Sequence, residues 1–213
     1  MYEERRGTPF RLCFLPTQMQ VGVEKYGYSP QKLLNNYRSS FLRNAYGSKK
    51  VYLPLNDGTH WYLAVVLIES KQVHLVDSAP MTDRHGNRTK VVGRMMEFLH
   101  DVFEKLYSEL EKMNEAPNIR NFHLIIPDKV PIQENGFDCG MWVCLWMMYS
   151  DAMNGYCVGP CNEVDRMMLA LKLVGWPQNS KLEKIHRHAR EHSSMWKDMI
   201  RKDMVLMHGD ARL

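Results

Sequence analysis

The sequence has no apolar run long enough to cross a membrane. Its longest apolar segments, AVVLI and MWVCLWMMY, are closed by the acidic residues Glu69 and Asp151, whereas a membrane-spanning helix needs roughly 20 apolar residues. The first ten residues, MYEERRGTPF, also lack the apolar centre of a secretory signal. We therefore expect no membrane association, and we expect the protein to reside in the nucleus or the cytoplasm.

Cysteine is scarce and gives no sign of a disulfide framework. An odd number of cysteines, five, is spread over 213 residues, which is typical of reduced thiols. Cys157 and Cys161 would form a zinc site only if histidines between residues 186 and 192 folded back to complete it. The sequence therefore predicts no bound metal and no cofactor. The five cysteines are Cys13, Cys139, Cys144, Cys157 and Cys161.

The chain also lacks internal repeats and long runs of one charge. The net charge of +4 comes from 28 Lys and Arg against 24 Asp and Glu, and these residues are scattered, so nucleic acid is not an expected partner. The basic residues between 181 and 202 are interpreted as the solvated face of a helix. The length predicts one domain, residues 1–213. The helical patterns at its end are expected to form an extension at about 162–213. We expect it to act as a monomer.

Strand-like segments cluster in the chain, and helical patterns flank them. Segments rich in β-branched and aromatic residues predict strands at 51–55, 61–69, 72–78 and 121–127. The segment LCFLP at 12–16 is either a brief strand or an extended segment closed by Pro16. Apolar residues at helical spacing predict helices at 30–46, 89–113, 163–174 and 180–207. The segment MWVCLWMMYSDAM is apolar all round, so we expect a helix that is buried on every side. Because strands and helices do not alternate strictly, the predicted class is α+β.

One cysteine stands where this apolar helix begins. In the segment PIQENGFDCGM, Cys139 lies between Asp138 and Gly140. The N–H groups in the first turn of a helix are unpaired and the helix dipole is positive there, which favours an anion. Since the thiolate is the nucleophilic form of cysteine, Cys139 is a candidate nucleophile. Cys144, inside the helix, is interpreted as a structural cysteine.

A cysteine nucleophile needs a base and a group that orients the base. Among nine histidines, His60 follows the turn sequence NDGT and precedes a predicted strand, so its imidazole can lie at the edge of the sheet. Asp77 ends the next predicted strand and can lie at the same end, where a carboxylate would fix the tautomer of His60. His74 and the histidines of the last helix are interpreted as packed or solvated residues.

Separated motifs resemble the catalytic core of the ubiquitin-like-protein-specific cysteine proteases, the family of SUMO-deconjugating enzymes. These motifs are VYLPLNDGTHWYLAVV around His60, VDS at 76–78 and IQENGFDCG ending at Gly140. The resemblance covers about residues 30–155 and implies that this range is the core of the domain. LCFLP near the N-terminus is similar to divergent plant members of the family. It implies a papain-like cysteine-protease fold, with a central mixed sheet flanked by helices and the nucleophile at the N-terminus of a buried helix.

The resemblance implies a role for each matching residue. His60 is the base, Asp77 orients it, Cys139 is the nucleophile, and Gln133 donates a side-chain N–H to the oxyanion. Trp61 matches a tryptophan that covers a narrow channel for a Gly-Gly tail. The implied activity is that of a peptidase or isopeptidase that cleaves after the glycine-ended tail of a ubiquitin-like modifier through a thioester acyl-enzyme. A SUMO-like protein and its conjugates are the expected partners.

The sequence departs from the family pattern near its start. Family members carry an upstream Trp-Leu-x-Asp-like segment whose ring forms the other wall of the channel, but this chain has no tryptophan before Trp61. Either Tyr2 or Phe10 replaces that ring, or the channel is more open. A catalytically idle module that binds a ubiquitin-like protein therefore stays open as a second function. An acyltransferase that uses the same triad is a third, because bacterial effectors with a similar His, acid, Cys arrangement transfer the acyl group to a side chain.

Overall fold

The chain forms two compact units, Met1–Cys161 and Asn162–Leu213. The computed structural model describes residues 12–37, 42, 45–109, 115–150, 155–158, 161–175 and 179–208, and in the last of these ranges it describes side chains only as far as Met195. Tyr2 and Phe10, the two proposed replacements for the missing tryptophan, lie outside the described residues.

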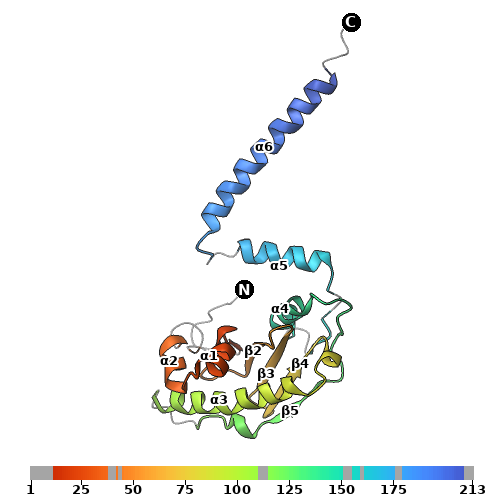
Figure 1. Ribbon diagram of the computed structural model, residues 1–213. Coiled ribbons are helices and arrows are strands. Elements are labelled where there is room, and N and C mark those ends of the chain that lie inside the picture. The colour runs from red at the N-terminus through yellow and green to blue at the C-terminus, as the bar shows by residue number, and fades with distance from the viewer. Residues whose placement is uncertain are drawn as a thin grey trace. The chain divides into compact units, whose positions relative to one another are not determined.

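Five strands form one mixed sheet in the order β1-β2-β3-β4-β5 (Figure 1). The three central strands are antiparallel to one another, and the two edge strands pair in parallel with their neighbours. Strands therefore form in all five predicted segments; four are shorter than predicted, and the one predicted at 51–55 is one residue longer at each end. The strands are β1 (Leu12–Phe14), β2 (Lys50–Asn56), β3 (Trp61–Leu67), β4 (Gln72–Val76) and β5 (His123–Ile125).

The helices of the first unit differ from the predicted ones mainly at their ends and in one addition. A helix at Gln18–Tyr26 was not predicted, and the predicted helix at 89–113 begins two residues earlier, at Asn87. The predicted helix at 30–46 ends at Tyr37 within the described residues. The helices are α1 (Gln18–Tyr26), α2 (Pro30–Tyr37), α3 (Asn87–Glu109) and α4 (Cys139–Tyr149), with short 3-10 turns η2 (Pro80–Thr82) and η3 (Ile119–Asn121).

The sheet is covered on both faces, because alternate residues of its strands are apolar in both directions. One set of side chains packs with α1, α2 and α3, and the other set packs with α4. The first set includes Val51, Leu53, Leu55, Tyr62, Ala64, Val66, Val73 and Leu75; the second includes Tyr52, Leu63, Val65 and Val76. The predicted α+β class, with a mixed sheet flanked by helices, is confirmed.

Helix α4 is buried on one side only. One side of the helix packs against the sheet face that carries Tyr52, Leu63, Val65 and Val76, through Trp142, Val143 and Trp146. At the end of the helix, Met148 and Tyr149 are 37% and 38% exposed. The expectation that this helix is buried on every side was therefore wrong. An apolar composition shows that a helix can be covered, but it does not show which faces the neighbouring elements reach.

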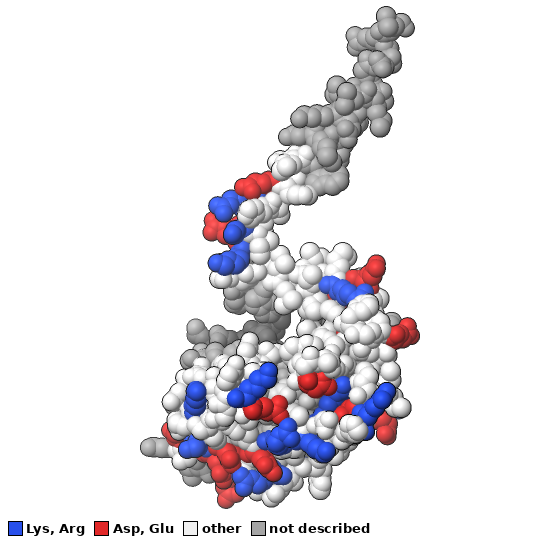
Figure 2. Space-filling model, in the orientation of Figure 1, with Lys and Arg blue, Asp and Glu red and all other residues white. Residues whose placement is uncertain are grey.

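The second unit contains α5 (Glu163–Gly175) and α6 (Leu182–His208), close to the predicted bounds. No residue of α5 is buried. Within the described part of the chain, no helix is long and apolar enough to span a membrane. On the face of the first unit shown in Figure 2, basic and acidic side chains are intermingled rather than gathered by sign.

Candidate active site

The loop between β2 and β3 fixes the backbone of His60. Asp57 begins this loop, and its Oδ1 accepts hydrogen bonds from the backbone N–H groups of Thr59 at 3.0 Å and His60 at 2.8 Å. The Thr59 hydroxyl donates to the same oxygen at 2.9 Å. Gly58 has a φ of +100°, a conformation that suits glycine. The carboxylate of Asp57 in the turn sequence NDGT therefore holds the backbone of His60 in place just before β3.

The structure brings the imidazole of His60 and the carboxylate of Asp77 into direct contact. Strands β3 and β4 are antiparallel, with Leu63 opposite Val76, so residues just before β3 and just after β4 lie at the same end of the sheet. His60 Nε2 and Asp77 Oδ1 are 2.8 Å apart, and both residues are buried. This contact occupies Nε2 and leaves Nδ1 as the ring nitrogen that can exchange a proton with another group.

The surroundings of Asp77 favour its ionised form. Burial raises the pKa of Asp77, but hydrogen bonds from His60, the Ala79 N–H and Arg88 outweigh burial, so the pKa lies below its ordinary value. An ionised carboxylate only accepts hydrogen bonds, so His60 Nε2 carries a proton and donates it. The tautomer of neutral His60 is thereby fixed with Nδ1 free of a proton.

Arg88, which is not among the predicted site residues, bonds to both Asp57 and Asp77 and so links the two carboxylates that hold His60. It lies in the first turn of α3 and is 3% exposed. Its Nη1 donates to Asp77 Oδ2 at 2.7 Å, and its Nε donates to Asp57 Oδ2 at 2.9 Å. A signal for Arg88 is present in the sequence, since it lies four residues before Val92 and therefore on the apolar face of α3.

The hydrogen bonds to Asp57 lower its pKa as well. Burial acts in the opposite direction and raises the pKa of Asp57. Hydrogen bonds from the Thr59 N–H, Arg88, the Thr59 hydroxyl and the His60 N–H outweigh burial and bring the pKa to about 2. One buried guanidinium is thus shared between two ionised carboxylates, one holding the His60 backbone and one holding its ring.

Gln133 is joined to the residue that follows Asp77. The Ser78 hydroxyl donates to Gln133 Oε1 at 2.7 Å, and the Gln133 N–H donates to the Ser78 carbonyl at 2.8 Å. Gln133 Nε2 in turn donates to the Asn135 carbonyl at 2.6 Å. The loop that leads to Cys139 is therefore attached to the end of β4.

Cys139 is the first residue of α4 and is 7% exposed. The turn before it is ordered by Asn135, whose Oδ1 accepts the N–H groups of Phe137 at 3.1 Å and Asp138 at 3.0 Å. Asn135 Nδ2 donates to Asp138 Oδ2 at 2.7 Å. The side chain of Asp138, the residue before α4, makes no capping hydrogen bond, so it does not occupy the N–H groups in the first turn of the helix.

Trp61 connects the His60 side of the site with the Cys139 side. A Cβ placed on Gly140 would lie 3.6 Å from Trp61 Cδ1, so the indole lies against the first turn of α4. The residue after His60 thus lies beside the residue after Cys139. Together with the bonds at Asp77 and Gln133, this proximity gathers all five predicted site residues at one end of the sheet.

Other histidines and cysteines have different surroundings. His74 Nδ1 and the Tyr156 hydroxyl are 3.0 Å apart, in the packed region predicted for His74. Burial raises the pKa of the Cys144 thiol, as expected for a structural cysteine. Among the described residues, three metal-ligating atoms gather only at His100, Asp101 and Glu104 on α3, and Arg120 donates to Asp101 there at 2.6 Å.

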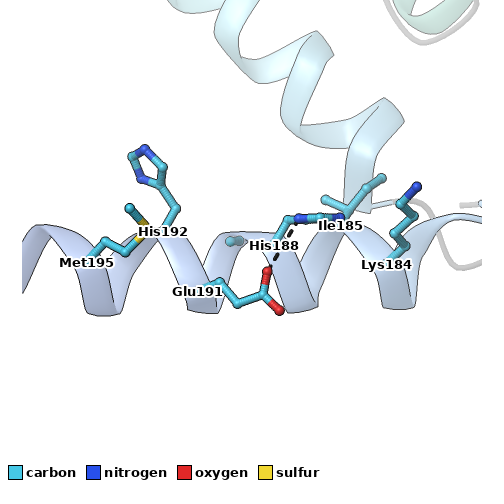
Figure 3. A pocket seen from close by; sticks show the side chains of 7 residues that line it. Lys184, Ile185, His188, Glu191, His192 and Met195 are labelled. Carbon is cyan, nitrogen blue, oxygen red and sulfur yellow. Dashed lines mark ion pairs between the residues drawn. The ribbon is translucent and has the colours of Figure 1, made fainter.

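A hollow of about 590 Å³ lies along α6 (Figure 3). His188 and Glu191 form an ion pair of 3.4 Å on its wall. None of the predicted site residues lines it. The lining residues are Lys184, Ile185, His188, Ala189, Glu191, His192 and Met195.

Comparison with known proteins agrees with the motifs. The sequence profile of the Ulp1 protease family, C-terminal catalytic domain, matches residues 28–150, more than half of the chain, and the chain therefore belongs to this family. Ubiquitin-like-specific protease 1A of Arabidopsis thaliana is 26% identical over 95 residues, which are 44% of this chain and 16% of that protein. The predicted resemblance is confirmed.

Solved structures similar to this chain include Ulp1 itself. The SUMO protease Ulp1 with its catalytic cysteine oxidised to a sulfinic acid is 19% identical, with a TM-score of 0.49 over 75% of this chain and 64% of that one. The C-terminal Ulp1 protease domain in complex with Smt3, the yeast ortholog of SUMO, is 21% identical, with a TM-score of 0.47 over 69% of this chain and 59% of that one.

Proposed function

We propose that this chain is a cysteine protease that cleaves after the glycine-ended tail of a ubiquitin-like modifier, with a SUMO-like protein as its first expected substrate. The observation that carries the proposal is the joined arrangement of His60, Asp77, Gln133 and Cys139 at one end of the sheet. Membership of the Ulp1 protease family supports the same conclusion. The modifier and its conjugates are the proposed partners, the chain acts as a monomer, and its place of action is the nucleus or cytoplasm.

The first half of the reaction forms a thioester. His60 Nδ1 takes the proton of the Cys139 thiol, and the thiolate attacks the carbonyl carbon of the terminal glycine of the modifier. Negative charge develops on the carbonyl oxygen, where an N–H of Gln133 Nε2 and the N–H groups in the first turn of α4 would stabilise it. The C–N bond then breaks, and His60 gives its proton to the departing amine.

The second half releases the modifier. Water attacks the thioester carbonyl while His60 Nδ1 takes a proton from it. The C–S bond breaks, the proton on His60 passes to the sulfur of Cys139, and the modifier leaves as a carboxylic acid that releases its remaining proton to the solvent. Asp77 keeps its charge throughout and stabilises the imidazolium that forms in each half.

Trp61 is the proposed gate for the tail. Its indole lies against the first turn of α4, which supports a path for the substrate tail to the sulfur of Cys139 beside the ring. Glycine residues, which have no side chain, need the least space in such a passage. Specificity for a glycine-ended tail follows from this contact.

The proposal is tested with ubiquitin-like proteins that carry a thiol-reactive group at the C-terminus. The protein is expected to form a covalent adduct with a SUMO-type probe, detected by intact mass, and the Cys139→Ala variant is expected to form none. Cys144→Ala is the matched control, since Cys144 lies on the same helix and burial raises its pKa. Binding without an adduct would favour the idle module, and an adduct lost in Cys144→Ala but kept in Cys139→Ala would reject the proposal.

A second expected result concerns Gln133. The Gln133→Ala variant should lose about 10²-fold to 10³-fold in kcat with little change in KM, because an oxyanion donor acts in the transition state. Steady-state hydrolysis of a SUMO C-terminal aminomethylcoumarin amide measures both constants. Gln31→Ala, which changes an exposed glutamine of α2, should keep the wild-type values; an equal fall in kcat for both variants would contradict the assignment.

A further inference from the structure

Ser78 occupies a position between the two halves of the candidate site. It is fully buried, with 0% exposure, and it directly follows Asp77 at the end of β4. While Asp77 holds the ring of His60, Ser78 bonds to Gln133 twice, through its hydroxyl at 2.7 Å and through its carbonyl at 2.8 Å. One dipeptide therefore contacts both the proposed base and the proposed oxyanion donor.

The bonds around Gln133 define which end of its amide is nitrogen. The Asn135 carbonyl can only accept a hydrogen bond, so the group 2.6 Å from it must be the NH₂ end of the Gln133 amide. The oxygen end then faces Ser78, whose hydroxyl must donate. The amide has two N–H groups, and Asn135 takes one, so one N–H has no acceptor among the hydrogen bonds that the structure describes.

We propose that Ser78 is a positioning residue that holds the Gln133 amide with this remaining N–H directed to the oxyanion. The inference rests on the proposed function, in which Gln133 is the oxyanion donor. The last side-chain torsion of glutamine is broad, so without the Ser78 hydroxyl the amide is free to turn. A turned amide would present its oxygen, which repels a developing negative charge, and an oriented dipole is effective only when it is held before the reaction.

The structure also explains why a serine suits this position. Its hydroxyl is small enough for a site with no exposed surface, and it can act as a donor while the neighbouring Asp77 accepts. Alanine would fill nearly the same space but would leave Gln133 Oε1 without its donor. The expected consequence is a fall in kcat of about tenfold, the size of one lost hydrogen bond in a site of this kind.

The test is a double-mutant cycle combined with NMR. With the SUMO aminomethylcoumarin amide, Ser78→Ala should lower kcat about tenfold without changing KM in the wild-type background. In the Gln133→Ala background, Ser78→Ala should change kcat by less than about twofold, because its effect passes through Gln133. The Gln133 Nε2 proton signals should move toward those of a freely rotating amide in Ser78→Ala.

Ser150→Ala is the matched control. Ser150 is also buried, at 4% exposure, and its hydroxyl lies 3.1 Å from that of Tyr52, so the variant loses a buried hydroxyl elsewhere. It should leave the Gln133 signals unchanged. Unchanged Gln133 signals in Ser78→Ala, or an equal loss of kcat in both backgrounds, would overturn the inference. If the Gln133 signals shift in Ser78→Ala but the wild type does not turn over the substrate, the proposed function is rejected. The finding that Ser78 holds the Gln133 amide would then still stand.

Discussion

The His60→Ala variant is expected to lose turnover by about 10⁴-fold, because it removes the group that takes and returns the proton in both halves of the reaction. The imidazole is held by Asp77 at 2.8 Å through Nε2, and His60 is the histidine whose hydrogen bond lowers the pKa of Asp77. The rate of hydrolysis of a SUMO aminomethylcoumarin amide, with substrate above KM, measures the loss. The same variant should also react more slowly with the thiol-reactive SUMO probe.

Two other histidines serve as controls of different kinds. His188 is 61% exposed in its side chain and lies on α6, so His188→Ala should keep full activity. His74 is half-buried in the sheet, next to Tyr156, so His74→Ala reports the cost of disturbing the packing. Thermal unfolding of each variant separates folding from chemistry. If His74→Ala, still folded, lost as much turnover as His60→Ala, the assignment of His60 as the base would be wrong.

The sequence predicted the positions of those site residues that lie at the end of a strand or at the start of a helix. His60 follows a turn and precedes β3, and Asp77 follows β4. The hairpin register, with Leu63 opposite Val76, was not readable from the sequence, but either neighbouring register would have left both residues at the same end. Cys139 was found because the start of an apolar helix is a recognisable boundary.

Residues that act through other side chains were not found. Ser78 has no distinctive spacing, and the place of Arg88 on the apolar face of α3 does not indicate which groups it bonds to. Their roles depend on partners 55 and 11 residues away in the sequence, Gln133 and Asp77. Such contacts are set by tertiary packing rather than by local pattern. Helix α1 was missed for a related reason, since its buried residues Met19 and Gly22 form no apolar stripe of several turns.

The Arg88→Met variant is expected to lower the free energy of unfolding by about 3–5 kcal/mol, the usual cost of removing one partner of a buried ion pair. Methionine keeps most of the volume of the arginine stem, so the loss reports the charge and its hydrogen bonds. Asp77 would remain buried, with a side chain 6% exposed, without its guanidinium. Urea unfolding at neutral pH measures the change.

Arg94→Met is the matched control on the same helix. The Arg94 side chain is 57% exposed and pairs with Glu24, and exposed pairs contribute at most about 1 kcal/mol. Both variants lose one arginine, so they change the net charge equally. A loss of similar size in the two variants would show that the buried position of Arg88 has no special effect.

The pH dependence of the Arg88→Met effect identifies its origin. In the wild type, the folded pKa values of Asp57, at about 2, and Asp77 lie below their ordinary values, so the unfolded chain binds more protons and stability rises with pH. This contribution is complete above the unfolded pKa of about 4 and is lost as the pH falls toward about 2. Without Arg88 both folded pKa values rise, so the difference between variant and wild type should shrink as the pH falls through this window. A constant difference from neutral pH to about pH 3 would mean that lost packing, and not the guanidinium charge shared by the two carboxylates, accounts for the destabilisation.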